Sequence, residues 1–534
     1  MALTTQNKNR AWGGAAVLAL ATLLSIPAQA TPGAGEDIIR NNCLACHSET
    51  GDSAAPFSRI SEQRKTPEGW QMTINRMQLL RGAQISAEDK AALIQYLADT
   101  QGLAPSEAEP YRYLLEQDTN IVEADLDEGL GQMCARCHSG ARFSLQRRSE
   151  AEWQNLVDFH MGQFPTIEFH SLARDRAWYD IARNETAVEL GKQFPLLSPQ
   201  WDSWKAAPKA DMAGRWRVLG FVPGQGEFEA QMSAEPSDSG YSLSLEGHYA
   251  DGSALSGSGT ARLYTGFEWR ASLSIDGVKM RQVMAADAEG GRMNGRMFSA
   301  AAREIGGELS AVRDQGKPRV VALMPAYLRQ GQSTEVTIVG QHLDGDISLG
   351  EGVTIEKVLQ RDADRIRVLA VANGDEGLRR VTVGAASHDG ALAVYQSLAR
   401  VEVLPAHAVS RIGGAGGKLE KVRASYRAVG FSAGADGKAG TEDDLRLGYM
   451  PASWSIAPAD EVAAHDKDHE YAGSINADGI FIPGDTGPNP ARKMSANNVG
   501  RLTVIASVTD GDAQVRGEGS MLVSVPDYVR RVLD

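Results

Sequence analysis

The sequence lacks the short motifs that mark several large classes of enzymes. It contains no Walker-type phosphate loop, no glycine-rich dinucleotide fingerprint and no G-x-S-x-G nucleophile elbow. Basic residues are fewer than acidic ones. The chain has 54 lysines and arginines and 68 aspartates and glutamates, so its formal net charge is −14. An acidic balance of this size argues against nucleic acid as a partner.

Long apolar runs are absent beyond the first 30 residues. Those residues hold Lys8 and Arg10, an apolar run at 15–26 and an A-x-A signature that ends at Ala30. This pattern is typical of a signal peptide cleaved after Ala30, and the apolar run is short for a membrane span. The sequence therefore predicts an exported, periplasmic chain with no membrane partner.

Cysteine is scarce, and all four cysteines fall in two C-x-x-C-H motifs, at 43–47 and 134–138. Four cysteines in an exported chain usually form two disulfides, but a histidine directly after each pair is typical of c-type haem attachment. The two thiols reach the vinyl groups of one porphyrin, and the histidine binds the iron from one face. A four-cysteine zinc site would leave both histidines unexplained, and a redox dithiol would need a βαβ context. The predicted haem attachment residues are Cys43, Cys46, Cys134 and Cys137, and the predicted proximal iron ligands are His47 and His138.

The two halves repeat a second pattern after each motif. Residues 64–70 and 147–153 both read as two basic residues, Thr or Ser, three further residues and then Trp. Thr66 is the predicted N-cap of one helix, with Pro67 at its first position. Ser149 is the predicted N-cap of the other, in a capping box with Glu152.

The predicted sixth iron ligands follow from this repeat. Seven residues beyond the tryptophan, on the predicted buried face, stands Met77 in the first half and His160 in the second. Both residue types bind haem iron, so the predicted ligand pairs are His47/Met77 and His138/His160. A core methionine and a surface histidine are the alternatives at these two positions. The rival ligands are Met72, Met161 and His170.

The two ligand pairs predict two different reduction potentials. Thioether ligation stabilises ferrous iron, so the haem with the methionine ligand should have the higher potential. Two six-coordinate haems leave no open iron position. The pattern therefore favours electron transfer over chemistry of the dihaem peroxidase type.

The rest of the chain predicts β structure. The 56 glycines and period-two stretches such as 241–248 and 267–275, with an Asp-Gly turn at 276–277, indicate antiparallel strands. The predicted fold class is multidomain: an all-α dihaem cytochrome c domain followed by three all-β domains. The predicted boundaries are 31–200 for the dihaem domain, 201–316 for a barrel or sandwich, 317–405 for an immunoglobulin-like sandwich of the TIG kind, and 406–534 for a C-terminal sandwich.

An exported chain with tandem CxxCH motifs, the Trp70/Met77 and Trp153/His160 repeat and three β domains resembles the α subunit of quinohemoprotein amine dehydrogenase. The specific motifs lie within residues 43–160, and the β region matches in order and character. The resemblance implies a periplasmic heterotrimer with a propeller β subunit and a small γ subunit, which carries a cysteine tryptophylquinone. It implies that this chain passes electrons from that quinone to a blue copper protein or a cytochrome c while primary amines are oxidised.

All four cysteines are committed to haem, so this chain has none left for a cysteine-derived quinone. The amine chemistry is therefore expected in a partner subunit, and the β domains are expected to form a docking frame. The alternative function is a free-standing periplasmic dihaem shuttle, or the electron-transfer subunit of another dehydrogenase.

Overall fold

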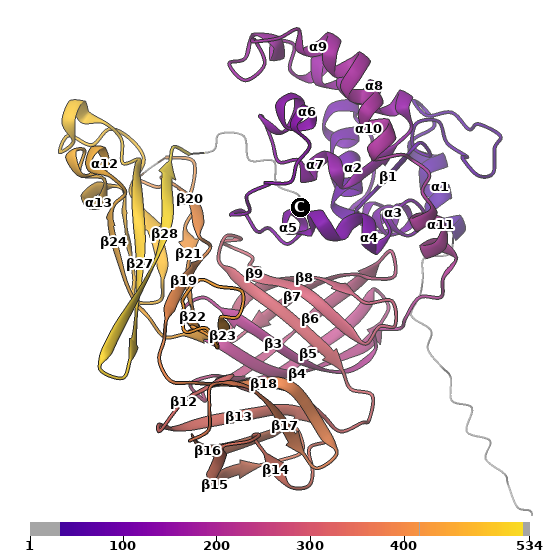
Figure 1. The fold of residues 1–534 in the computed structure, drawn as a ribbon. Helices are drawn as coiled ribbons and strands as arrows, with labels where there is room; N and C mark the ends of the chain where they lie inside the picture. Colours follow the sequence, from indigo (N-terminus) through magenta and orange to yellow (C-terminus); the bar gives the residue numbers. More distant parts are fainter. Residues whose placement is uncertain (1–31, 416, 527–534) are drawn as a thin grey trace, which may run out of the picture.

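The computed structural model describes residues 32–415 and 417–526 (Figure 1). The predicted signal peptide and its cleavage after Ala30 lie outside the described residues. Within the described ranges, no helix combines the length and the apolar character needed to cross a membrane. A helical region at 32–206 is followed by an eight-stranded barrel and then by two further groups of β-sheets.

The helical region is built from a few longer helices joined by single turns. The longer helices are α1 (Pro32–Asn42), α2 (Pro67–Arg81), α3 (Ala87–Thr100), α8 (Glu150–Gln163), α10 (Ala187–Gln193) and α11 (Pro199–Ala206). The single-turn helices are α4 (Pro105–Ala108), α5 (Arg112–Leu115), α6 (Glu128–Leu130), α7 (Ala141–Ser144) and α9 (Trp178–Ile181). Two π-helical turns are at Gly131–Ala135 and Ala182–Thr186, and two 3₁₀ turns are at Glu109–Tyr111 and Ile167–Phe169.

The two predicted N-caps are confirmed. Thr66 Oγ1 accepts a hydrogen bond from the amide of Gly69 at 3.2 Å, and Ser149 Oγ accepts one from the amide of Glu152 at 3.2 Å. The predicted reciprocal half of the capping box at Ser149 is wrong. The Glu152 carboxylate instead accepts from Arg59 Nε at 2.7 Å, because a charged donor binds a carboxylate more strongly than a backbone amide does.

The predicted all-α class of the N-terminal region is also wrong. Strands β1 (Gln63–Lys65) and β2 (Gln146–Arg148) pair antiparallel, with Arg64 opposite Arg147. Each strand has three residues without period-two alternation, and each pairs only because the two halves of the region meet, so neither was visible in the sequence. Strands make up 41% and helices 23% of the structure, so the chain as a whole is mostly β.

The next region is a closed barrel in the order β10-β3-β4-β5-β6-β7-β8-β9. Its core contains the fully buried side chains of Trp216, Phe228 and Trp269. The Asp-Gly turn between β7 and β8 is confirmed: Asp276 and Gly277 both have positive φ, at 48° and 83°, as a tight hairpin requires. The barrel strands are β3 (Gly214–Val222), β4 (Gly226–Ser237), β5 (Gly240–Tyr249), β6 (Ala254–Tyr264), β7 (Glu268–Ile275), β8 (Val278–Ala286), β9 (Arg292–Ser299) and β10 (Gly306–Arg313).

Two four-stranded sheets follow the barrel and share one hydrophobic core. The first has the order β11-β13-β16-β15, with β11 (Arg319–Met324), β13 (Ser333–Gln341), β16 (Arg365–Ala372) and β15 (Val353–Arg361). The second has the order β12-β18-β17-β14, with β12 (Tyr327–Arg329), β18 (Ala386–Tyr395), β17 (Gly377–Val383) and β14 (Ile347–Ser348).

The described part of the last region has three small sheets, two short α-helices and a 3₁₀ turn at Lys493–Ser495. The sheets are β19 (Arg400–Leu404), β22 (Arg427–Ser432) and β23 (Leu445–Met450); β20 (His407–Arg411), β28 (Ala513–Ser524), β27 (Gly500–Asp510) and β24 (Ser453–Pro458); and β21 (Ala424–Ser425), β26 (Ile480–Pro483) and β25 (Gly473–Ile475). Helices α12 (Glu461–His465) and α13 (Asp468–Tyr471) correct the predicted all-β class here, and Asp460 caps α12 by accepting from the amide of Ala463.

The helical region is fastened to the barrel by charged contacts. Arg270 Nε on β7 lies 2.6 Å from Glu68 Oε1 on α2, and Arg112 Nη1 on α5 lies 2.9 Å from Glu268 Oε1 on β7. These groups are mostly buried. Removing one member of either pair would therefore leave the other charge buried and unpaired, which destabilises the fold. Figure 1 shows the helical region lying along one side of the barrel.

Candidate haem sites

The first CxxCH motif forms a helical turn that continues α1. The amide of Cys43 donates to Ile39 O at 2.8 Å, and the amide of His47 donates to Cys43 O at 3.0 Å. Residues three apart on such a turn lie on the same side, so Cys43 and Cys46 face one direction. Burial raises the pKa of the half-buried Cys43 thiol, whereas Cys46 is exposed.

The second CxxCH motif begins within a π-helical turn. Cys134 lies in the turn Gly131–Ala135, and Trp178 Nε1 holds that turn by donating to Met133 O at 2.9 Å. Burial raises the pKa of Cys134 to about 12, so its thiol is protonated at neutral pH. Cys137, the second cysteine of the motif, is exposed.

The structure describes all four cysteines as free thiols. None of the four cysteines, all of which lie in the described part of the chain, is in a disulfide. Across residues 32–415 and 417–526, no group of three or more His, Cys, Asp or Glu side chains could hold a metal ion.

The two predicted proximal histidines, His47 and His138, are oriented through Nδ1. His47 Nδ1 lies 3.0 Å from Ser58 O, and His138 Nδ1 lies 2.9 Å from Ser139 O. A carbonyl acceptor places the ring proton on Nδ1, so the lone pair that binds a metal is on Nε2. Each half thus offers two thiols on a turn, followed directly by an imidazole whose Nε2 can bind iron. This set of groups fits a covalently held haem in each half.

Each motif packs with the predicted ligand helix of its own half. Cys43 contacts the hydrophobic cluster that contains Trp70 and Ile74 of α2. Cys134 contacts a separate cluster that contains Trp153 and Val157 of α8. The structure therefore groups motif and helix half by half, as the repeat in the sequence predicts.

The predicted sixth ligands lie one turn further along these helices. Met77 follows the buried Ile74 on α2 and is half-buried. His160 follows Val157 on α8, its Nδ1 lies 2.7 Å from Leu156 O, and its ring centroid is 6.1 Å from that of Trp178. Of the rivals, His170 is exposed, Met72 is half-buried and Met161 packs against the second cluster.

The repeat begins earlier in each half than the pattern at 64–70 and 147–153. Residues 59–66 read RISEQRKT and residues 142–149 read RFSLQRRS. The two copies make the same side-chain contact. Gln63 Nε2 donates to Arg59 O at 2.8 Å, and Gln146 Nε2 donates to Arg142 O at 2.6 Å. The shared Arg-x-Ser-x-Gln spacing is the signal that would have revealed this part of the site.

A buried carboxylate links the two halves at the centre of the repeat. Glu107 on α4 accepts two hydrogen bonds from Arg64, at 2.9 and 3.0 Å, and one from Arg147 Nε at 3.1 Å. Ser198 Oγ also donates to it at 2.8 Å. The two guanidinium groups hold the pKa of Glu107 at about 2, against the cost of burying its charge. Arg64 and Arg147 are the residues opposite each other in the β1–β2 pair, so Glu107 fixes the halves where they meet.

Comparison with known protein families identifies the helical region first. Residues 33–201 match the family model described as "Quinohemoprotein amine dehydrogenase A, alpha subunit, haem binding". Residues 209–314, 317–396 and 401–533 match the models for domains II, III and IV of the same alpha subunit.

The helical region is thus a haem-binding domain of an oxidoreductase subunit. The chain as a whole belongs to the family of quinohemoprotein amine dehydrogenase alpha subunits, as the resemblance in its sequence predicted.

Comparison with individual proteins adds little. No curated protein matches the chain. Among solved structures, a redesigned β-barrel, mFAP1, bound to DFHBI covers 19% of this chain and 94% of its own, at 16% identity and a TM-score of 0.18. The mouse clustered PcdhgC3 EC1-3 covers 46% of this chain and 86% of its own, at 10% identity and a TM-score of 0.17. These scores are too low to support an argument about fold or function.

Proposed function

We propose that this chain is the dihaem electron-transfer subunit of a periplasmic amine dehydrogenase complex. It carries electrons from a cysteine tryptophylquinone in a partner subunit to a blue copper protein or a cytochrome c. The observation that carries the proposal is the repeated unit. Each CxxCH turn packs with the helix that bears the predicted sixth ligand, and each predicted proximal histidine is oriented through Nδ1.

In this proposal the cysteines and histidines have separate roles. Cys43 and Cys46 hold one haem c and Cys134 and Cys137 hold the other. Each haem supplies a one-electron carrier when bound. The proximal ligands are His47 and His138, and the sixth ligands are Met77 and His160.

The proposed division of the chain places these residues in a dihaem domain at 31–200. The β domains at 201–316, 317–405 and 406–534 form the docking frame for a propeller β subunit and a small quinone-bearing γ subunit. Since both cysteine pairs of this chain are assigned to haem, the quinone and the amine chemistry belong to the partner.

Purification of the chain from its host tests this function. We expect it to elute with two companion subunits, identified by mass spectrometry. Within that complex a primary amine should reduce the haem iron, which the haem absorption bands report. The isolated chain should not respond to the amine, because it lacks the quinone. A chain that elutes alone, with haems that no amine reduces, would instead support the free-standing shuttle.

Substitution of the sixth ligands tests the proposed ligand pairs. We expect Met77→Ala and His160→Ala each to convert one of the two haems from low spin to high spin, because the iron loses its sixth ligand. Visible absorption and magnetic circular dichroism of the purified chain measure this change. Met72→Ala and Met161→Ala are the matched controls and should leave both haems low spin. A spin change in a control variant, with none in Met77→Ala or His160→Ala, would reassign the ligand.

A further inference from the structure

Each predicted proximal histidine faces a peptide group whose own N–H is bound by a carboxylate. In the second half, His138 Nδ1 lies 2.9 Å from Ser139 O. The N–H of the same peptide group belongs to Gly140, and it donates to Glu123 Oε2 at 2.8 Å. A continuous chain of hydrogen bonds therefore leads from the imidazole through one peptide group to the Glu123 carboxylate.

The Glu123 carboxylate is held in this position by further donors. The amide of Ala141 donates to Oε1 at 3.1 Å, and the hydroxyl group of Tyr113 on α5 donates to the same oxygen. A Cβ at Gly140 would lie 2.9 Å from Leu126 and 3.4 Å from Glu123 Oε2, so glycine allows this close approach. Burial opposes the charged form of Glu123, but these hydrogen bonds outweigh it and lower the pKa of the carboxyl group below its ordinary value. The carboxylate is therefore ionised at neutral pH.

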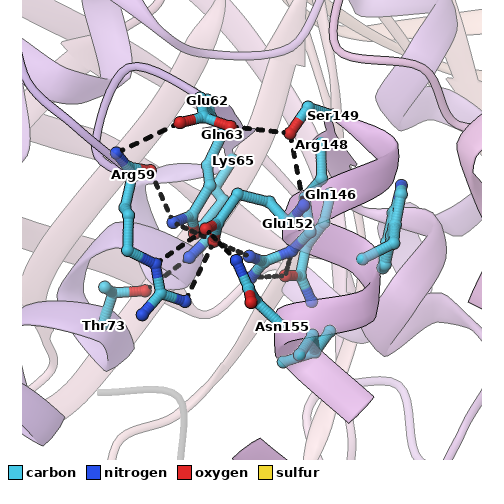
Figure 2. A network of polar contacts seen from close by, with 12 residues as sticks. Arg59, Glu62, Gln63, Lys65, Thr73, Gln146, Arg148, Ser149, Glu152 and Asn155 are labelled. Atoms are coloured by element: carbon cyan, nitrogen blue, oxygen red, sulfur yellow. Dashed lines mark hydrogen bonds and ion pairs between the residues drawn. The ribbon is translucent and has the colours of Figure 1, made fainter. Parts of the chain in front are cut away.

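The first half has the same arrangement with a longer contact. His47 Nδ1 lies 3.0 Å from Ser58 O. The N–H of that peptide group belongs to Arg59, and it donates to Glu62 Oε1 at 3.4 Å. Figure 2 shows Glu62 between the Arg59 amide and the Ser149 hydroxyl group, which donates to Glu62 Oε2 at 2.9 Å. A hydrogen bond of 3.4 Å is weak, so the first half has the weaker of the two chains.

The two carboxylates come from positions that the repeat does not relate. In the alignment of residues 59–66 with 142–149, Glu62 is equivalent to Leu145. Glu62 follows the first CxxCH motif, whereas Glu123 precedes the second. The same arrangement thus arises from different parts of the chain in the two halves. This indicates that it is tied to the proximal histidine and is not a by-product of the repeat.

A carboxylate on the N–H of a peptide group makes the carbonyl oxygen of that group a stronger acceptor, because hydrogen bonds in a chain polarise one another. A stronger acceptor at Nδ1–H makes the imidazole more basic, so Nε2 becomes a better donor to iron. Ferric iron gains more from a better donor than ferrous iron does, since it carries the higher charge. The negative charge of the carboxylate also favours the ferric state.

We infer that Glu123 is a positioning residue that lowers the reduction potential of the haem bound by His138, acting through the peptide group between them. The inference rests on the proposed dihaem function. Glu62 acts in the same way on the haem bound by His47, but more weakly because its amide contact is longer. This difference adds to the difference between the methionine and histidine ligands, so the two haem potentials lie further apart.

Redox titration of the haem-loaded complex, followed by absorption spectroscopy, tests this inference. Glu123→Gln should raise the potential of the lower-potential haem and shift its ratio of reduced to oxidised iron about tenfold, which is 59 mV for one electron. Glu62→Gln should raise the potential of the other haem by a smaller amount, and a larger rise there would overturn the inference. Asp125→Asn is the matched control, because Asp125 is exposed on the same segment as Glu123, and it should change neither potential.

A further variant separates this role from a purely structural one. Tyr113→Phe removes another hydrogen bond of the Glu123 carboxylate but leaves its contact with the Gly140 amide. It should therefore not raise the potential of the lower-potential haem. An equal rise in Tyr113→Phe and Glu123→Gln, or in Asp125→Asn and Glu123→Gln, would contradict a role that acts through the peptide group.

The absorption spectrum separates this inference from the proposed function. Glu123→Gln with both haems bound and low spin, but at wild-type potentials, overturns the inference and leaves the function standing. A wild-type chain without covalent haem overturns the function itself. If Glu123→Gln fails to bind haem, Glu123→Ala replaces it. That variant also lacks the charge, the same rise is expected, and an unchanged potential in it overturns the inference.

Discussion

Replacing Cys43 and Cys46 together by alanine should leave one covalently attached haem per chain where the wild type has two. The two motifs pack against separate hydrophobic clusters, one with α2 and one with α8, so loss of one attachment site leaves the other in place. The covalent haem content, measured after extraction with acidified organic solvent, should fall by half. The haem that remains should be the one attached at Cys134 and Cys137, with His138 as its proximal ligand.

The complementary variant is the control for this result. Replacing Cys134 and Cys137 should remove the other haem and leave the higher-potential one. Loss of both haems from either variant, in a chain that still folds, would contradict two independent sites. Retention of both haems in either variant would contradict attachment through these thiols.

Replacing Glu107 by alanine should destabilise the helical region strongly. The substitution leaves the Arg64 and Arg147 guanidinium groups buried without their carboxylate, which costs about 3–5 kcal/mol for a broken buried pair. Thermal or denaturant unfolding of the haem-loaded chain measures the loss. Glu189→Ala is the matched control, because its contact with Lys192 is exposed and it should not change the unfolding midpoint. Equal stability of the two variants would contradict the role given to Glu107.

The same carboxylate predicts a dependence of stability on pH. The pKa of Glu107 is about 2, below the ordinary value of 4.5, because Arg64 and Arg147 stabilise its charged form. Its contribution is therefore fully present above pH 4.5 and is lost as the pH falls from 4.5 toward 2. Glu107→Gln should lack this part of the acid sensitivity. Unfolding curves across this pH range, compared between the wild type and Glu107→Gln, measure the difference.

The parts of the fold that follow from local chemistry were predictable from the sequence. Thr66 and Ser149 are polar residues directly before helical stretches, and both cap helices as predicted. The Asp-Gly turn at Asp276 and Gly277 joins two barrel strands for the same local reason.

The errors arose where distant segments meet. Strands β1 and β2 are three residues each, and the capping box at Ser149 is incomplete because Arg59, 93 residues away, binds the Glu152 carboxylate. The burial of Lys65 and of Glu107 between the two halves was not predicted. A single basic or acidic residue in a sequence does not reveal burial.

The same distinction between local patterns and contacts of distant segments applies to the predicted haem residues. The spacing within C-x-x-C-H carries its chemistry locally, so attachment at Cys43, Cys46, Cys134 and Cys137 could be proposed from the motif alone. The assignment of Met77 and His160 depends on two helices having the same relation to two motifs. The structure supports that relation by packing each motif with its own helix, and the ligands themselves stay a prediction.

The intact mass of the chain purified from its host tests the central claim most directly. Two porphyrins bound through thioether bonds predict the mass of the polypeptide plus two haem groups, in a protein that keeps its red colour in acidified organic solvent. A mass equal to that of the bare polypeptide, or a pigment that the solvent removes, would contradict the account.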